Sequence, residues 1–264
     1  MKNYFSNLFK HSIIAICVFC SISTFAQFSE KDTSNNEFLT PIGIGFNHLQ
    51  GSFSNRFTNF KSFHSGLLYK NRKQFVFGIQ GSYLFGANLK DSSMFEGIIN
   101  ENGTIVGGTG VPSIIEFGGR GFQVKGSFGK IFTLWDKNPN NGLLLLSSLG
   151  LLQHKIFVNI PENDIPQLNK VYRKGYDRLS NGLELSQFIG YIHLAESKEG
   201  GRQMFVPTYF FGIEVSNAWI QNRRSWNYDQ IKQDTKLHYD QMVNFKFGWL
   251  IRVNSARKND FHYF

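Results

Sequence analysis

The chain has 264 residues, of which 41% are hydrophobic and 16% aromatic, so it contains enough apolar material for one domain-sized core. Only 18% of the residues are charged, below the roughly 25% of an average soluble domain. Phe occupies 28 positions and Gly 26, a composition that favours strands facing an apolar medium. No run of about 18 consecutive apolar residues occurs, which excludes a bundle of transmembrane helices.

The first 26 residues have the pattern of a signal peptide. Two lysines give a positive start, residues 13–22 form a short apolar centre, and small residues precede a cut after Ala26. The alternative is a buried N-terminal helix. Both cysteines of the chain, Cys17 and Cys20, fall inside this peptide, so the mature chain would have no disulfide. It would keep 26 basic against 19 acidic residues, a balance that favours contact with phosphates or an acidic partner.

After the peptide, apolar and polar residues alternate in period two, which places successive side chains on opposite faces of a strand. The clearest case is 241–253, where Val, Phe, Trp and Ile alternate with Asn, Lys, Gly and Arg. Eight strands are predicted, at residues 42–47, 61–69, 75–85, 122–129, 143–156, 183–194, 205–216 and 241–253. The small and charged residues that alternate with the aromatics are typical of a narrow wet lumen.

The predicted links between strands alternate in length. Links at 70–73, 133–141 and 195–202 are short, like periplasmic turns, whereas those near 50–60, 86–118, 157–181 and 220–239 are longer, like cell-surface loops. A sheet in lipid must close on itself because its backbone groups must all be paired.

We therefore predict an all-β fold, an eight-stranded antiparallel transmembrane β-barrel at residues 41–253, in the bacterial outer membrane. A periplasmic segment at 27–40 would precede it and a periplasmic tail at 254–264 would follow it. The alternative is a secreted lipocalin-like barrel or a β-sandwich. So many aromatic side chains would overfill the interior of a small soluble barrel.

Five charged residues are expected to point into the lumen: Lys125, Glu184, Glu214, Lys246 and Arg252. Because an unpaired buried charge is costly, we expect the opposite charges to pair across the lumen. Eight strands leave an interior that is only just wide enough for side chains. We therefore predict a plugged structural core in preference to a conducting pore.

Two long loops mix basic and aromatic side chains. Residues 167–181 read QLNKVYRKGYDRLSN and residues 221–229 read QNRRSWNYD. The candidate residues for recognition or for packing at the barrel mouth are Tyr172, Arg173, Lys174, Tyr176, Asp177, Arg178, Arg223, Arg224 and Trp226. Arg binds lipid phosphates or a partner's carboxylates, and Tyr and Trp favour interfaces. The equally weighted alternative is that the loops fold over the mouth and pair with each other through Arg and Asp.

An enzymatic alternative arises because some eight-stranded outer-membrane barrels modify lipid A with a His and Ser or acidic partners. No pair of histidines has metal-ligand spacing such as HExxH, and we predict no metal and no other cofactor. His154, at the outer end of the fifth strand, is the one histidine to test. Beside Lys155, it is more typical of an interface residue than of a general base. No nucleic-acid-binding motif occurs, so no nucleic-acid partner is predicted.

Three stretches, together with an aromatic-ended tail, carry a resemblance to a known family: residues 152–191, residues 221–229 and FGWLI at 247–251. They resemble small Bacteroidota outer-membrane barrels of the PorG family. Members of this family are accessories of type IX protein secretion and, in some species, of gliding motility. The resemblance covers roughly the C-terminal half.

The resemblance implies a non-enzymatic protein that lies among outer-membrane lipid and lipopolysaccharide. It also implies contact with a periplasmic ring of secretion proteins through the short turns and the basic tail, and it supplies no catalytic residue. The alternatives left open are a lipid A-modifying enzyme, a surface-binding protein and a narrow channel.

Overall fold

The structure, a computed structural model, describes residues 36–90, 104–133 except 109, 141–159, 165, 168–169, 172–194, 208–228 and 230–253. The predicted signal peptide, the predicted tail and the start of the predicted strand at Phe205 lie outside the described residues. No helix in these described ranges is long and apolar enough to cross a membrane.

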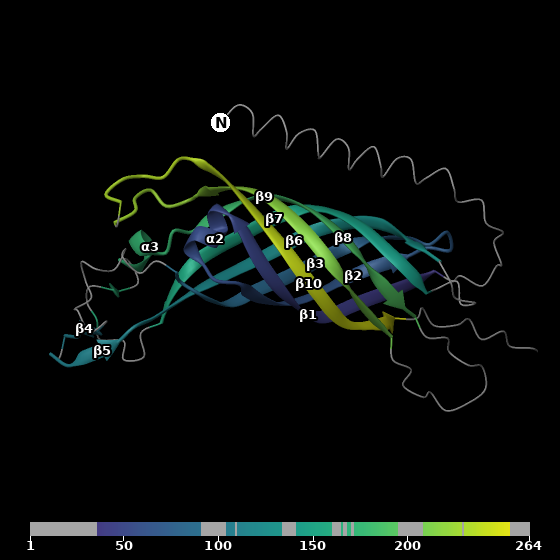
Figure 1. The fold of residues 1–264 in the computed structure, drawn as a ribbon, viewed down its shortest axis with the longest axis horizontal. Helices are drawn as coiled ribbons and strands as arrows, with labels where there is room; N and C mark the ends of the chain where they lie inside the picture. Colours follow the sequence, from purple (N-terminus) through teal and green to yellow (C-terminus); the bar gives the residue numbers. More distant parts are fainter. Residues whose placement is uncertain are drawn as a thin grey trace, which may run out of the picture. The chain divides into compact units, whose positions relative to one another are not determined.

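Eight strands close into an antiparallel barrel in the order β1-β10-β9-β8-β7-β6-β3-β2 (Figure 1). Their bounds are β1 (Glu37–Gly51), β2 (Phe60–Lys70), β3 (Phe75–Asn88), β6 (Glu116–Phe132), β7 (Gly142–Asn159), β8 (Ser180–His193), β9 (Tyr209–Asn222) and β10 (Leu237–Val253). The longer connections contain α2 (Ser52–Arg56), α3 (Arg173–Tyr176) and a hairpin of β4 (Thr104–Val106) and β5 (Pro112–Ile114). The predicted fold class is confirmed.

The main differences from the predicted strands are at their ends. β1 begins at Glu37, inside the segment 27–40 that was predicted to precede the barrel, and Phe38 pairs with Val253 of β10. β6 begins at Glu116, six residues before the predicted start. The ladder continues there because backbone pairing does not depend on aromatic side chains, whereas the sequence pattern does. Glycines at residues 118, 119 and 121 hide that part of β6 from the pattern.

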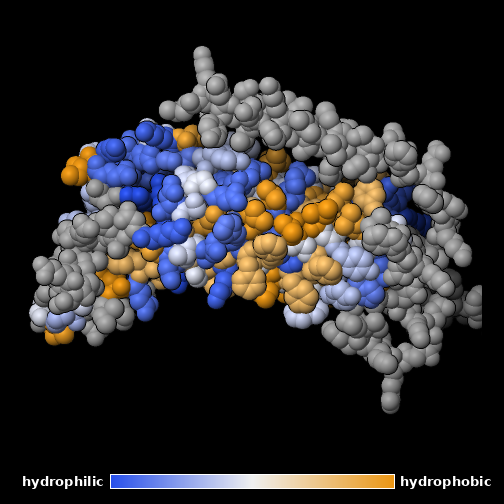
Figure 2. All heavy atoms as spheres, viewed as in Figure 1, coloured by the Kyte–Doolittle hydropathy of each residue, from blue (hydrophilic) through white to orange (hydrophobic). Residues whose placement is uncertain are grey.

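The two faces of each strand differ in composition and in exposure, as the alternation predicts. Outward side chains such as Ile79 and Phe46 are 64% and 57% exposed. Their chain neighbours Gln80 and Asn47 point inward and are buried. On the face drawn in Figure 2, hydrophobic side chains gather across the middle of the barrel and hydrophilic ones toward the end with the longer connections. We call this end the loop end and the opposite end the turn end.

The interior is filled by three layers of side chains. An apolar layer at the loop end includes Phe53, Phe57 and Phe60, together with Leu84 and Leu152. An apolar layer at the turn end comprises Leu39, Leu68, Val76, Ile131, Leu144, Leu146, Phe188, Ile192, Leu194, Phe210 and Leu250. Between them lies a polar layer that holds most of the predicted lumen charges.

Candidate functional site

Four of the five predicted lumen charges form one network in the middle of the barrel. The ammonium of Lys125 on β6 lies 2.6 Å from the carboxylate of Glu214 on β9 and 3.7 Å from that of Glu184 on β8. Glu214 also accepts a hydrogen bond from Lys246 of β10 at 2.8 Å. All four residues are buried, and Lys125 is only 1% exposed. Two positive and two negative groups make the network formally neutral, which offsets the desolvation of each charge.

Neutral polar side chains add hydrogen bonds to this network, although Oε2 of Glu184 has no hydrogen-bond partner among the described residues. The amide of Gln123 donates to Glu184 at 2.8 Å, and the ammonium of Lys125 also donates to the hydroxyl of Ser186 at 3.2 Å. Buried charges are tolerated when such hydrogen bonds satisfy the remaining lone pairs and protons. The arrangement therefore serves to hold four strands together across the lumen.

The fifth predicted lumen residue, Arg252, lies outside this network. Its guanidinium donates to both carboxylate oxygens of Glu37, at 2.9 Å and 2.6 Å, at the turn end of β1 and β10. Arg252 is six residues from Lys246 along β10, which separates the two by about 20 Å of strand. Glu37 was missed because the first strand was predicted to begin later. Its inward parity with Leu39 is the signal that could have identified it.

The cavity next to the polar layer is small. It lies beside His64 and Lys246 among side chains of the turn-end apolar layer, and its volume is about 20 Å³. A space of this size holds about one water molecule. At this level of the described barrel, the space beside the polar layer is therefore too small for a solute larger than water.

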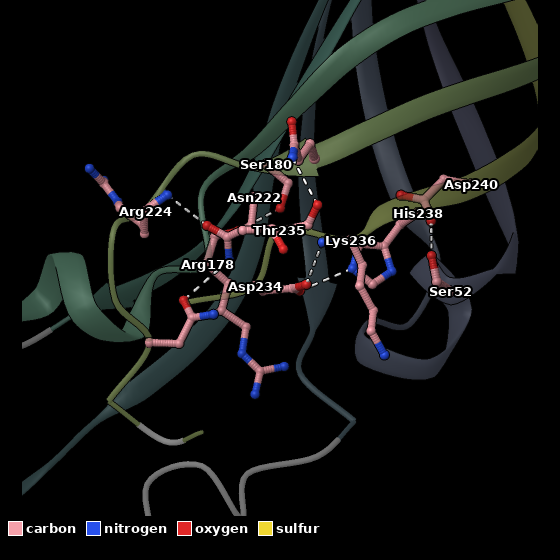
Figure 3. Close-up of polar contacts among 12 residues, drawn as sticks. Ser52, Arg178, Ser180, Asn222, Arg224, Asp234, Thr235, Lys236, His238 and Asp240 are labelled. Atoms are coloured by element: carbon pink, nitrogen blue, oxygen red, sulfur yellow. Dashed lines mark hydrogen bonds and ion pairs between the residues drawn. The ribbon is translucent and has the colours of Figure 1, made fainter. Parts of the chain in front are cut away.

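Helix α2 folds into the mouth of the barrel, above the polar layer. The ring of Phe53 stacks on that of His154 at 4.2 Å, and Phe57 meets the same imidazole edge-on at 6.1 Å. Ser52 donates a hydrogen bond to the carboxylate of Asp240 (Figure 3). The other carboxylate oxygen of Asp240 lies 3.4 Å from Nε2 of His154. These contacts connect α2 to β7 and β10. We refer to Phe53, Phe57 and Phe60 as the aromatic plug.

This position makes His154 part of the lumen packing. The prediction that it is an interface residue is wrong, because its ring points inward and is 2% exposed. A general base must come within hydrogen-bond reach of its substrate, which an imidazole covered by Phe53 does not. Asp240 lies between Ser52 and His154, whereas a hydrolytic triad needs the histidine next to the serine.

The two loops of basic and aromatic residues contact each other. Arg224 forms a fork with Asp177, with Nε donating to one carboxylate oxygen at 2.7 Å and Nη2 donating to the other. These hydrogen bonds raise the pKa of Arg224 above its ordinary value, against the opposing effect of partial burial. The backbone N–H of Tyr228 donates to Gly175 at 3.1 Å, and its ring lies 5.4 Å from that of Tyr176. The loops therefore support each other at the mouth.

The other predicted loop residues divide between support and exposure. Arg173 donates to the carbonyl of Leu168 and Arg223 to the amide oxygen of Asn181, each at 2.5 Å. Arg178 has a positive φ of 44° at the start of β8. Tyr172 and Trp226 are 50% and 47% exposed, and Lys174 is also exposed.

A second polar pair at the loop end was not predicted. Asp234 lies 3.0 Å from Nε2 of His238 and accepts a backbone hydrogen bond from Lys236 at 3.2 Å. Burial raises the pKa of Asp234, but the hydrogen bonds from His238 and Lys236 lower it by more. The pKa of Asp234 therefore lies below its ordinary value. No group of three or more His, Cys, Asp or Glu side chains placed to hold a metal occurs among the described residues.

The barrel, its outward apolar belt and its polar packed interior define a transmembrane β-barrel of the bacterial outer membrane. In this class the short turns face the periplasm and the longer loops face the cell surface. The loop end, with α2, α3 and the two interacting loops, is therefore the extracellular end.

No protein-family model and no curated protein matches the sequence. Among solved structures, the chain is similar to Neisserial surface protein A at 8% identity, covering 82% of this chain and 97% of that chain with a TM-score of 0.40. Ail of Yersinia pestis is 10% identical over 82% and 99% of the two chains, and OprG of Pseudomonas aeruginosa 8% over 84% and 98%, both with TM-scores of 0.40. The assignment of the chain to the outer-membrane β-barrels rests on the geometry of its own barrel.

Proposed function

We propose that this protein is a non-enzymatic accessory of protein secretion, of the type IX kind, that contacts periplasmic machinery from the outer membrane. The observation that carries the proposal is the filled lumen. Three layers of side chains occupy the interior, so the barrel offers its wall and its two ends as working surfaces. The resemblance in residues 152–191 and 221–229 supplies the secretion role.

The turn end presents a small basic surface suited to such a contact. In the turn between β2 and β3, Arg72 and Lys73 are exposed. The turn is held by Asn71, whose side-chain oxygen accepts from the N–H of Phe75 at 2.9 Å and whose carbonyl accepts from Gln74 at 3.0 Å. Two cations on an ordered turn favour an acidic patch on a periplasmic partner, since complementary charge guides docking.

Site-specific photo-crosslinking in native cells tests this proposal. A photoreactive residue replaces Arg72 at the turn end and, as the matched control, Trp226 at the loop end. We expect crosslinks from position 72 to periplasmic ring proteins of the secretion machinery and none to those proteins from position 226. Folded protein that crosslinks to no periplasmic partner from position 72, or to the same partners from both positions, would refute the proposal.

A surface-binding role is the second candidate, because the supported loop pair displays Tyr172, Lys174 and Trp226 to solvent. Exposed aromatics on an ordered base are typical of binding surfaces. The lipid A-modifying alternative has less support, since its one candidate base, His154, is enclosed by the aromatic plug. A narrow channel likewise conflicts with the packed polar layer.

A further inference from the structure

The outer wall of β6 to β10 carries side chains in ordered rows near the extracellular end. Antiparallel register places one residue of each strand directly opposite one of the next. The lower row, Val124, Leu151, Leu183, Trp219 and Tyr239, is apolar or aromatic. The next row, Phe122, Gln153, Asn181, Gln221 and Leu237, has three amides at its centre. We call these the apolar row and the amide row.

A groove of about 480 Å³ runs along these two rows, with Gly182 in its floor. Its volume lies within the roughly 300–1,000 Å³ of typical ligand sites. Leu183 and Trp219 line the part nearer the middle of the barrel, and Arg223 lines the upper rim. The groove is on the lipid-facing side of the barrel and is therefore separate from the lumen.

A third row of cations lies beyond the amide row, toward the cell surface. Arg120 of β6 and Lys155 of β7 are register partners, both exposed, and each lies two residues beyond a member of the amide row. Arg223 lies two residues beyond Gln221, another member of that row. The acidic side chain on the same face of β6, Glu116, is two rows farther out, so the three cations come first above the groove.

Hydrogen bonds and a cation–π contact hold this upper edge in place. Arg223 donates to Asn181 at 2.5 Å, and Gln221 donates to the carbonyl of Thr235 at 2.9 Å. The guanidinium of Arg120 lies 3.3 Å from the ring centre of Phe157. Side chains that are already ordered lose less conformational entropy when a ligand binds.

We propose that this groove binds lipopolysaccharide of the outer leaflet through its lipid A portion. The proposal rests on the outer-membrane placement described above. From the middle of the barrel toward the cell surface, the apolar, amide and cationic rows match three parts of an acylated phosphosugar in the same order. These parts are the acyl chains, the polar acyl linkages and the sugar phosphates. Arg and Lys pair with phosphate, and amides hydrogen-bond to hydroxyl and acyl-linkage groups. A groove across five strands at the extracellular end faces the leaflet that contains this lipid.

An outward cation on the opposite wall supplies a matched control. Lys61 of β2 is an exposed outward cation near the loop end, but its register partners are Phe46 and Phe85. Lys61 thus has the charge without the amide row. A lipid attracted by charge alone would respond equally to the loss of Lys61 and of a groove cation.

Binding of purified lipid A to the folded full-length protein in detergent, measured by native mass spectrometry, tests the proposal. The variants are Lys155→Ala, Arg223→Ala, the triple replacement of Arg120, Lys155 and Arg223 by Ala, and the control Lys61→Ala. Folding of each is checked first by its migration in gels with and without heating. Each cation near a lipid surface contributes about fivefold in affinity, so the triple variant should bind about 100-fold more weakly.

We expect Lys61→Ala to bind lipid A within about twofold of the unmodified protein and each groove single variant about fivefold more weakly. If the triple variant does not fold, the two single groove variants test the proposal. Equal losses at Lys61 and Arg223, unchanged binding in the groove variants, or equally tight binding of phosphatidylglycerol would overturn the lipid A assignment. The crosslinking test of the secretion role probes Arg72 at the turn end of the barrel. If that test fails, the lipid A binding measured at the loop end can still be interpreted.

Discussion

Removing the ammonium of Lys125 tests whether the lumen network stabilises the barrel. In Lys125→Met, Glu214 keeps Lys246 at 2.8 Å, while Glu184 keeps the amide of Gln123 but loses its cation. Breaking a buried ion pair by removing one partner costs about 3–5 kcal/mol of unfolding free energy. The network also changes from formally neutral to a net charge of −1. We therefore expect a loss in that range.

The double variant Lys125→Met/Glu184→Gln separates uncompensated charge from lost packing. It restores neutrality and leaves the pair of Glu214 and Lys246 intact. Replacing both members of a buried pair is often close to neutral, so we expect a loss of only about 1–2 kcal/mol. The double variant should thus be more stable than the single one, although it carries more changes.

Urea unfolding of the folded barrel in lipid vesicles, followed by tryptophan fluorescence, measures both free energies. The unmodified protein and Lys61→Ala, a cation on the outer wall, serve as references. A loss below about 1 kcal/mol in Lys125→Met would mean that the pair behaves like a solvent-exposed one, and the reasoning would fail. A double variant less stable than the single one would also refute it, because charge imbalance could then not be the cause.

Three further outcomes follow from contacts at the mouth. Phe53→Ala should lower the unfolding free energy by about 3–5 kcal/mol in the same urea titration, since it empties a buried aromatic site. Arg224→Ala should release the fork with Asp177, cost about 1 kcal/mol because the pair is partly exposed, and speed protease cleavage of the extracellular loops. The pKa of Asp234 is lowered in the folded protein, so its contact with His238 stabilises the loop fully above the carboxyl's ordinary pKa of 3.8. This stabilisation should be lost as the pH falls below 3.8 and through the lowered pKa of Asp234. Hydrogen exchange of the loop amides, measured at pH values above and below 3.8, tests this expectation.

The sequence predicted the faces of the strands well because strand side chains have a period of two. Phe245 and Phe247 had to share a face, and Lys246 had to take the other. Placing the aromatic face toward lipid then directed Lys125, Glu184, Glu214 and Lys246 inward. The same rule did not reveal their distances, because these depend on the stagger between strands that the closed barrel sets.

The aromatic plug and the lipid groove could not be predicted for two different reasons. Helix α2 has five residues, too few for a helical period to show, and its stability comes from packing of Phe53 and Phe57 in the mouth. The rows of the groove combine residues from five strands. Gln153 and Gln221 come into one row, on either side of Asn181, only through the register of β7, β8 and β9.

The energy needed to open the mouth argues for function at the wall and the ends. Each side chain of the aromatic plug contributes about 1.5–3 kcal/mol by burial, so expelling all three would cost about 5–9 kcal/mol. Since every 1.4 kcal/mol is tenfold in population, fewer than roughly one molecule in 10³ would have an open mouth. That rare state would still contain the ion pairs of Lys125 and Lys246 and the apolar layer at the turn end. Passage through the lumen would require rearranging three independent layers, whereas a partner at Arg72 or a lipid at Arg223 needs none of them to move.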